Sequence, residues 1–179
     1  VATLASQLSQ IITEHSVATQ GVITIPARTI PFTEKLIYPG YIPGLFPGLY
    51  LDVNLTRQTI YIMNNNDKLA EYLISSGKRG TPTPVGVFYI KNKLALAQSR
   101  LFPGIWMEKW NALARNPDGS GYEGYGLHRV PCFDANCVNR ENIAHLGRSV
   151  SHGCVRISYE GADWIFDNAP IGTPVNIHL

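Results

Sequence analysis

The sequence predicts a mainly β domain, and two observations carry this prediction. The 179 residues include sixteen Gly and twelve Pro but only 16% charged residues, a composition that favours short strands and tight turns over long helices. In residues 49–55, apolar Leu and Val alternate with Tyr, Asp and Asn, as in a strand with one buried face. A chain of this length can form one domain with its own hydrophobic core and a modest extension.

Further strand candidates follow along the chain. Residues 59–63 come after a short polar turn, and Asn-Asn-Asn-Asp at 64–67 supplies the next turn. Alternation returns at 70–74, which favours another strand. The remaining candidates are residues 85–90, residues 124–128 and a closing strand at 174–179. Residues 105–113 show no clean period, so the sequence leaves their structure open.

One helix is predicted within this β region. Ser158 is a good N-cap residue, and the apolar residues at 162, 165, 166 and 169 recur at helical spacing before Pro170 ends the pattern. A second helix is predicted near the N-terminus, because the apolar residues of 2–15 share one helical face. Three Pro-Gly dipeptides at 39–48 then indicate a linker or wrapping segment. We therefore expect an N-terminal extension over 1–45 and the main domain over 46–179.

Charge and hydropathy narrow the classes of partner. The net charge is only +2 and no Lys/Arg run forms a patch, so nucleic acid is not an expected partner. No stretch approaches the ~20 apolar residues that span a bilayer. The chain begins at Val1 without a methionine, which leaves open a leader or a membrane anchor upstream.

The three cysteines divide into a close pair and a single residue. Cys132 and Cys137 lie near each other and Cys154 stands alone, which suggests one short disulfide and one free, reactive thiol. Three reduced, inert cysteines are the first alternative. A zinc site completed by His145 or His152 is the second, although the sequence offers no second pair of cysteine ligands.

The segment Ser-His-Gly-Cys-Val-Arg at 151–156 is the most informative for chemistry. A cysteine becomes a nucleophile when its thiolate is stabilised by an imidazolium or by backbone N–H groups. Gly153 lets the backbone around Cys154 approach a substrate closely, as an oxyanion site requires. Arg156 adds a positive charge suited to a substrate carboxylate.

A general base must come from elsewhere in the chain, and three histidines are candidates. His128 ends the predicted strand Gly-Tyr-Gly-Leu-His, and a strand end is a rigid place from which to aim an imidazole. His145 lies in a polar, helix-like stretch, where we expect it to be solvated. His152 neighbours the cysteine, but adjacent residues of an extended segment point to opposite faces. His128 is therefore the preferred base.

These motifs together resemble the L,D-transpeptidase catalytic domain of the YkuD type. Ser-His-Gly-Cys followed by an apolar residue and Arg, with Gly-x-His upstream, is the main likeness. Residues 80–88 resemble that family's Thr-Pro-x-Gly-x-Phe turn and strand, 49–63 its opening hairpin, and 105–110 its aromatic segment before the histidine. The likeness covers roughly residues 47–179, and two separated motifs in the right order are more specific than either alone.

The resemblance implies a role for each matching residue. Cys154 is the expected nucleophile and His128 the expected base, with the backbone around Gly153 and Cys154 as the oxyanion site. The third member of the triad in this family is usually a carbonyl that orients the imidazole, and Arg129 is where we expect it. The predicted oxyanion and substrate-binding residues are Ser151, His152, Gly153, Arg156 and Arg129.

The resemblance also implies a fold and an activity. The expected fold is an L,D-transpeptidase-like β-sandwich with a short helix after the nucleophile and an N-terminal helical extension. The expected reaction joins a donor tetrapeptide stem of peptidoglycan to an acceptor amine as a 3→3 cross-link, without cofactor or metal. Such enzymes, which carbapenems target, work outside the cytoplasm, which favours a disulfide between Cys132 and Cys137. The alternatives are an L,D-carboxypeptidase and a peptidoglycan-binding module without catalysis.

One feature departs from the family pattern. The segment between His128 and Ser151 is longer than the family usually has, and the excess coincides with residues 131–137. We interpret it as a loop insertion beside the site that affects substrate preference and access.

Overall fold

The computed structural model describes residues 24–25, 28–29 and 40–179, and the chain divides into two compact units, Val1–Ile37 and Tyr38–Leu179. In the first unit, the described residues form a short antiparallel pair, β1 (Thr24–Ile25) and β2 (Arg28–Thr29). The helix predicted over 2–15 lies outside the described residues.

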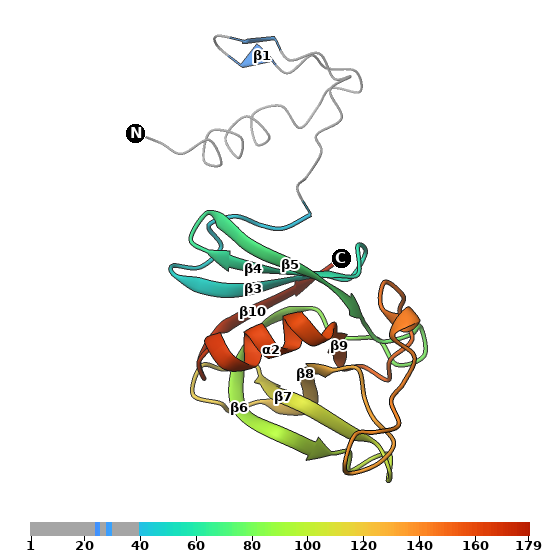
Figure 1. The fold of residues 1–179 in the computed structure, drawn as a ribbon. Coiled ribbons are helices and arrows are strands. Elements are labelled where there is room, and N and C mark those ends of the chain that lie inside the picture. Colours follow the sequence, from blue (N-terminus) through green and yellow to red (C-terminus); the bar gives the residue numbers. More distant parts are fainter. Residues whose placement is uncertain (1–23, 26–27, 30–39) are drawn as a thin grey trace. The chain divides into compact units, whose positions relative to one another are not determined.

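In the second unit, residues 40–179 form eight strands with one α-helix and one 3-10 helix (Figure 1). The strands are β3 (Leu49–Asn54), β4 (Thr59–Asn64), β5 (Asp67–Ser75), β6 (Gly86–Gln98), β7 (Trp106–Ala114), β8 (Tyr122–Arg129), β9 (Val155–Ile157) and β10 (Pro174–His178). The 3-10 helix η1 (Ile143–His145) precedes β9, and helix α2 (Tyr159–Asn168) joins β9 to β10.

The eight strands close into a barrel in the order β10-β3-β4-β5-β9-β8-β7-β6. The predicted β-sandwich is therefore wrong, although the mainly β class with one short helix after Cys154 is confirmed. Closure depends on β10, which pairs in parallel with β3 and antiparallel with β6. Register shifts within the β4–β5, β6–β7 and β7–β8 pairs let the strands bend, as β-bulges do. Alternation in a sequence reports a strand's buried face, whereas these pairings decide between sandwich and barrel.

Most strands appear where alternation predicted them, and two elements differ. The segment 105–113, whose structure the sequence left undecided, corresponds to β7. The last five residues of β7 are all buried, so its sequence shows no period of two. The short strand β9 follows Cys154 directly and was not predicted as a separate strand. It pairs antiparallel with β5 and in parallel with β8, and these two partners hold the residues after Cys154 in place.

The hydrophobic core is shared by the strands and helix α2. Ala162 and Ile165 of α2, and Ala169 directly after it, are fully buried in the same cluster as residues of all eight barrel strands. Ser158 caps the helix by accepting from Gly161 N–H, as the sequence predicted. A Cβ at Gly161 would lie 2.5 Å from the Tyr72 ring, so glycine lets the helix approach β5 closely.

The Pro-Gly segment packs on the β3–β4 hairpin over its described residues, 40–48. Ile42 N–H donates to buried Asp52 Oδ2 at 2.7 Å, and Tyr50 Oη donates to the carbonyl of Ile42 at 2.6 Å. Tyr41 and Phe46 cover a small second cluster that includes Tyr50. This segment therefore wraps onto the barrel of its own unit.

Candidate active site

The candidate site is built by the parallel pairing of β8 with β9. Leu127 pairs with Val155 and His128 with Arg156, so Cys154, one residue earlier, lies beside Gly126. Leu127 and Val155 belong to the hydrophobic core. Because side chains alternate along strands, Cys154, His128 and Arg156 point to the opposite face, onto a cavity of about 950 Å³ that all three line.

The His128 imidazole is held by its own neighbourhood. Its Nδ1 lies 2.5 Å from the carbonyl oxygen of Arg129, so Nδ1–H donates to that carbonyl and Nε2 remains an acceptor. The ring stacks on Trp110, with centroids 5.7 Å apart and planes at 30°. A Cβ at Gly126 would lie 2.5 Å from that indole, so this glycine makes room for the stack.

Burial determines the charge of His128. It lowers the pKa of the imidazole from 6.5 to about 4, the Arg129 carbonyl opposes this shift, and the charge of Arg156 adds to it. The imidazole is therefore neutral near pH 7, with Nε2 able to accept a proton.

The Cys154 thiol is also shifted by burial. Desolvation raises its pKa, while a backbone hydrogen bond with Gly126 and the positive charge of Arg156 oppose the shift. Cys154 therefore rests as a thiol in the free protein rather than as a thiolate. A neutral thiol and a neutral imidazole thus face the same cavity, an arrangement in which an imidazole can act as the base for a thiol.

The turn before Cys154 is braced by side-chain hydroxyls. Ser151 Oγ donates to the carbonyl of Cys154 at 2.6 Å and accepts from Gly153 N–H at 3.0 Å. The N–H of Gly153, expected at the oxyanion site, thus has a partner within its own loop. Gly153 has φ +119°, and a Cβ there would lie 2.7 Å from the Tyr125 ring, so this position requires glycine.

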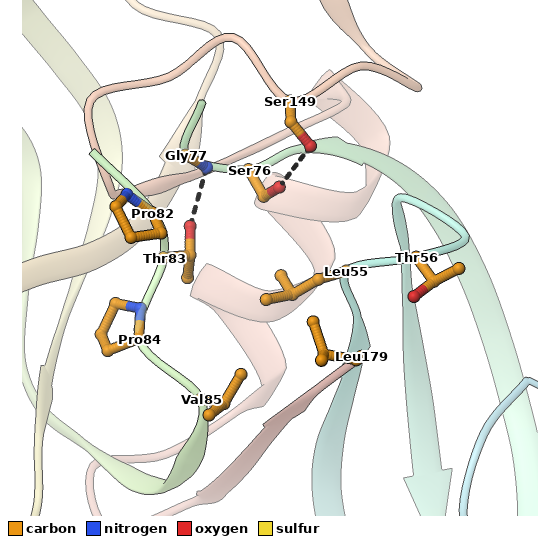
Figure 2. A pocket seen from close by; sticks show the side chains of 10 residues that line it. All are labelled: Leu55, Thr56, Ser76, Gly77, Pro82, Thr83, Pro84, Val85, Ser149 and Leu179. Atoms are coloured by element: carbon orange, nitrogen blue, oxygen red, sulfur yellow. Dashed lines mark hydrogen bonds between the residues drawn. The ribbon is translucent and has the colours of Figure 1, made fainter. Parts of the chain in front are cut away.

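Thr83, which lies in the Thr-Pro motif, joins this turn to another loop. Its Oγ1 donates to the carbonyl of Gly153 at 2.8 Å and accepts from Gly77 N–H at 2.8 Å. Figure 2 shows the second of these bonds at a separate cavity of about 470 Å³, lined also by Ser76 and Ser149, whose hydroxyls are 3.1 Å apart. The motif was noted in the sequence, but its contact with the cysteine turn was not.

Two of the predicted substrate-binding side chains have other partners. The Arg129 guanidinium pairs with Asp163 and Glu108 and does not line the cavity, so only its carbonyl contributes to the site. His152 does line the cavity, where its ring lies 4.7 Å from that of Phe102 and its Nε2 lies 3.4 Å from Lys78 Nζ.

Arg156 pairs with a residue that the sequence did not suggest. Its Nη1 donates to Glu141 Oε1 at 2.8 Å, and the same oxygen lies 2.9 Å from His145 Nδ1. Glu141 also lines the cavity. No motif marks this carboxylate, which comes next to Arg156, and onto the cavity that Cys154 lines, only through folding.

The loop after β8 carries a disulfide between Cys132 and Cys137, whose Cα atoms are 5.0 Å apart. Backbone hydrogen bonds in both directions between Cys132 and Trp106, at 2.8 and 2.9 Å, attach the loop to the start of β7. Phe133 is 46% exposed and lines the cavity. Among the residues that the structure describes, no group of three His, Cys, Asp or Glu side chains could hold a metal ion.

Comparison with known proteins decides the family. The family model of the L,D-transpeptidase catalytic domain, YkuD, matches residues 48–177. The chain belongs to the L,D-transpeptidase family. The resemblance drawn from the two separated motifs is thereby confirmed, and the matched range contains the whole β8–β9 site.

Relatives of the family share about a quarter of the residues. The Bacillus subtilis protein YciB is 27% identical over 139 residues, which cover 72% of this chain and 65% of YciB. L,D-transpeptidase 1 of Mycobacterium tuberculosis is 27% identical over 128 residues, covering 69% of this chain and 48% of that protein. The chain thus spans from about half to two thirds of the length of these relatives.

Solved structures of the family share the fold. An L,D-transpeptidase from Stackebrandtia nassauensis has a TM-score of 0.60 at 19% identity, covering 81% of this chain and 62% of its own. L,D-transpeptidase 3 from Mycobacterium tuberculosis, in complex with a faropenem-derived adduct, has a TM-score of 0.57 at 18% identity, covering 74% of this chain and 61% of its own.

Proposed function

We propose that this protein is a cysteine-dependent L,D-transpeptidase that forms 3→3 peptidoglycan cross-links. The observation that carries the proposal is the β8–β9 register, which directs Cys154 and a neutral His128 onto one cavity. Enzymes of this family act on peptidoglycan stem peptides, and the substrates here are a donor tetrapeptide and the side-chain amine of a second stem.

The first half-reaction acylates Cys154. His128 Nε2 takes the thiol proton, and the thiolate attacks the carbonyl of the third residue of the donor stem. The peptide bond to the terminal D-alanine breaks, and the imidazolium returns its proton to the departing amine. A thioester remains on Cys154. The Arg129 carbonyl keeps the imidazole in the required tautomer throughout.

The second half-reaction transfers the acyl group. The acceptor amine attacks the thioester, His128 takes the proton that the amine loses, and the regenerated thiolate recovers that proton from the imidazolium. An amide between two third residues forms and the thiol is restored. The carboxypeptidase alternative replaces the amine with water. The complete Cys154–His128 pair argues against a binding module without catalysis.

The location proposed for this activity is outside the cytoplasm. The Cys132–Cys137 disulfide supports this location, because such bonds persist in oxidising compartments. No helix among the described residues is long and apolar enough to cross a bilayer.

Incubation with defined tetrapeptide muropeptides tests the proposal, with mass spectrometry of the products. Cross-linked dimers as the major product, with tripeptide as the minor one, are the expected result. Tripeptide alone would establish the carboxypeptidase instead. Cys154 is tested separately with a carbapenem, because the L,D-transpeptidase LdtMt1 has been solved in complex with imipenem, a carbapenem. Intact-mass analysis should show one adduct, absent from Cys154→Ser, and an adduct retained by that variant would place the nucleophile elsewhere.

A further inference from the structure

Glu141 has an unusual environment for a cavity-lining carboxylate. Its Oε1 is held by Arg156 Nη1 at 2.8 Å and by His145 Nδ1 at 2.9 Å. Its Oε2 is buried and has no hydrogen-bond partner among the described residues. A buried carboxylate oxygen without a donor is costly, which makes it a candidate for a donor brought by a ligand.

The position of Glu141 is determined by the backbone on both sides of the disulfide loop. Its N–H donates to the carbonyl of Pro131 at 2.9 Å, and Cys132 and Arg140 form an isolated β-bridge. The carboxylate is therefore presented by a constrained loop rather than by a free chain segment. Such a support is what a selective binding group requires.

The Arg156 guanidinium and the Glu141 carboxylate lie side by side as a cation and an anion, and Arg156 lies close to Cys154 along the chain. Arg156 lies two residues after Cys154 on the same face of the strand, about 6.6 Å along it at ~3.3 Å per residue. The donor's third residue is attached to Cys154 through its carbonyl carbon, and its side chain extends a few methylene groups from there. That side chain can therefore reach the pair.

We infer that Arg156 and Glu141 select a donor whose third residue ends in a free α-amino acid group, carrying an ammonium and a carboxylate on one carbon. Arg156 binds the carboxylate, and Glu141 Oε2 accepts from the ammonium. meso-Diaminopimelate has both charges, a lysine residue lacks the carboxylate, and amidated diaminopimelate keeps the ammonium but replaces the carboxylate with a neutral amide. The inference rests on the proposed function, because it names the donor for that reaction.

The test measures binding by isothermal titration calorimetry with the full chain carrying Cys154→Ser, so that no acyl transfer occurs. The ligands are tetrapeptides with meso-diaminopimelate, its amide or L-lysine at the third position. We expect the diaminopimelate peptide to bind at least tenfold more tightly than the other two. Glu141→Gln should weaken its binding by about ten- to a hundredfold, the range for one lost charge-assisted hydrogen bond.

Glu123→Gln is the matched control, because Glu123 lines the same cavity and is also ion-paired, to Arg115. It should change each affinity by less than threefold. Equal affinities for the three peptides, or equal effects of the two variants, would overturn the assignment. So would a Glu141→Gln variant that lowers only the melting temperature, since Glu141 would then only neutralise Arg156. Carbapenem acylation of Cys154 needs no diamino acid, so it reports the proposed function separately.

Discussion

The hydroxyl of Thr83 donates a 2.8 Å hydrogen bond to the carbonyl oxygen of Gly153, the residue before Cys154. The Thr83 hydroxyl oxygen also accepts from Gly77 N–H, so one side chain connects the loop after β5 to the cysteine turn. Seventy residues separate Thr83 from Gly153. The orientation of the turn before Cys154 thus depends on a loop distant in sequence.

Thr83→Val should remove both bonds while keeping the shape of the side chain. We expect a loss of about 1–3 kcal/mol in unfolding free energy, because the partly buried N–H of Gly77 and the buried carbonyl of Gly153 lose their partner. Carbapenem acylation should slow by roughly tenfold as the turn loosens. Urea unfolding and the acylation rate measure the two effects. Thr83→Ser retains the hydroxyl and should behave like the parent protein, and a Val variant with unchanged acylation would remove Thr83 from the positioning of Cys154.

His128→Ala should lower the rate of carbapenem acylation by roughly 10²–10⁴-fold, the usual effect of losing a general base. The neutral Cys154 thiol would then lose the imidazole proposed to take its proton. His145→Ala is the control, because His145 contacts Glu141 and does not line the cavity. Acylation is followed by intact mass over time. A greater loss in the His145 variant would reverse the assignment of the base.

The lowered pKa of His128 predicts that the unfolding free energy decreases as the pH is lowered through a defined window. Between pH 6.5 and about 4, the values for the unfolded and folded states, the unfolded chain holds a proton on this imidazole and the folded one does not. Unfolding therefore takes up a proton, so a lower pH favours the unfolded state. The shift corresponds to about 3 kcal/mol lost between pH 7 and 4. Urea unfolding at several pH values should show this loss, and His128→Asn should lack that share of it.

The disulfide loop is expected to favour the amine over water as acyl acceptor. Phe133 lines the cavity from this loop, where an apolar side chain helps to exclude water from the thioester. Replacing residues 132–137 with a Gly-Ser turn should shift the products from cross-linked dimer toward tripeptide and leave the carbapenem adduct intact. Mass spectrometry of muropeptide products measures the ratio.

Val138→Ala is the control for the loop, because Val138 is 84% exposed and does not line the cavity. It should leave the product ratio unchanged. The same ratio in the shortened protein would show that the loop has no role in acceptor choice.

Non-reducing peptide mapping should find Cys132 linked to Cys137 with Cys154 free, and a linkage that includes Cys154 would contradict the loop described above.

Several features of the protein follow from the sequence by itself, because their physical causes are local. The alternation at 49–55 comes from side chains that face the hydrophobic core and the opposite side of the strand in turn, although Tyr50 and Asp52 on that opposite side are buried as well. Ser158 and Pro170 mark the ends of α2 through their own hydrogen-bonding properties. The segment at 151–156, together with Gly-x-His upstream, pointed to the family and made Cys154 the expected nucleophile.

Tertiary structure alone decided the rest. The closing pairs of β10 with β3 and β6 join strands from opposite ends of the domain, and no local pattern records a partner so distant. Glu141 became part of the cavity because Arg156 lies on β9, beside β8. The neutral charge of His128 also comes from folding, since burial and not sequence sets its pKa. Pairing, burial and desolvation depend on neighbours brought together in space, and these neighbours determine how the site works.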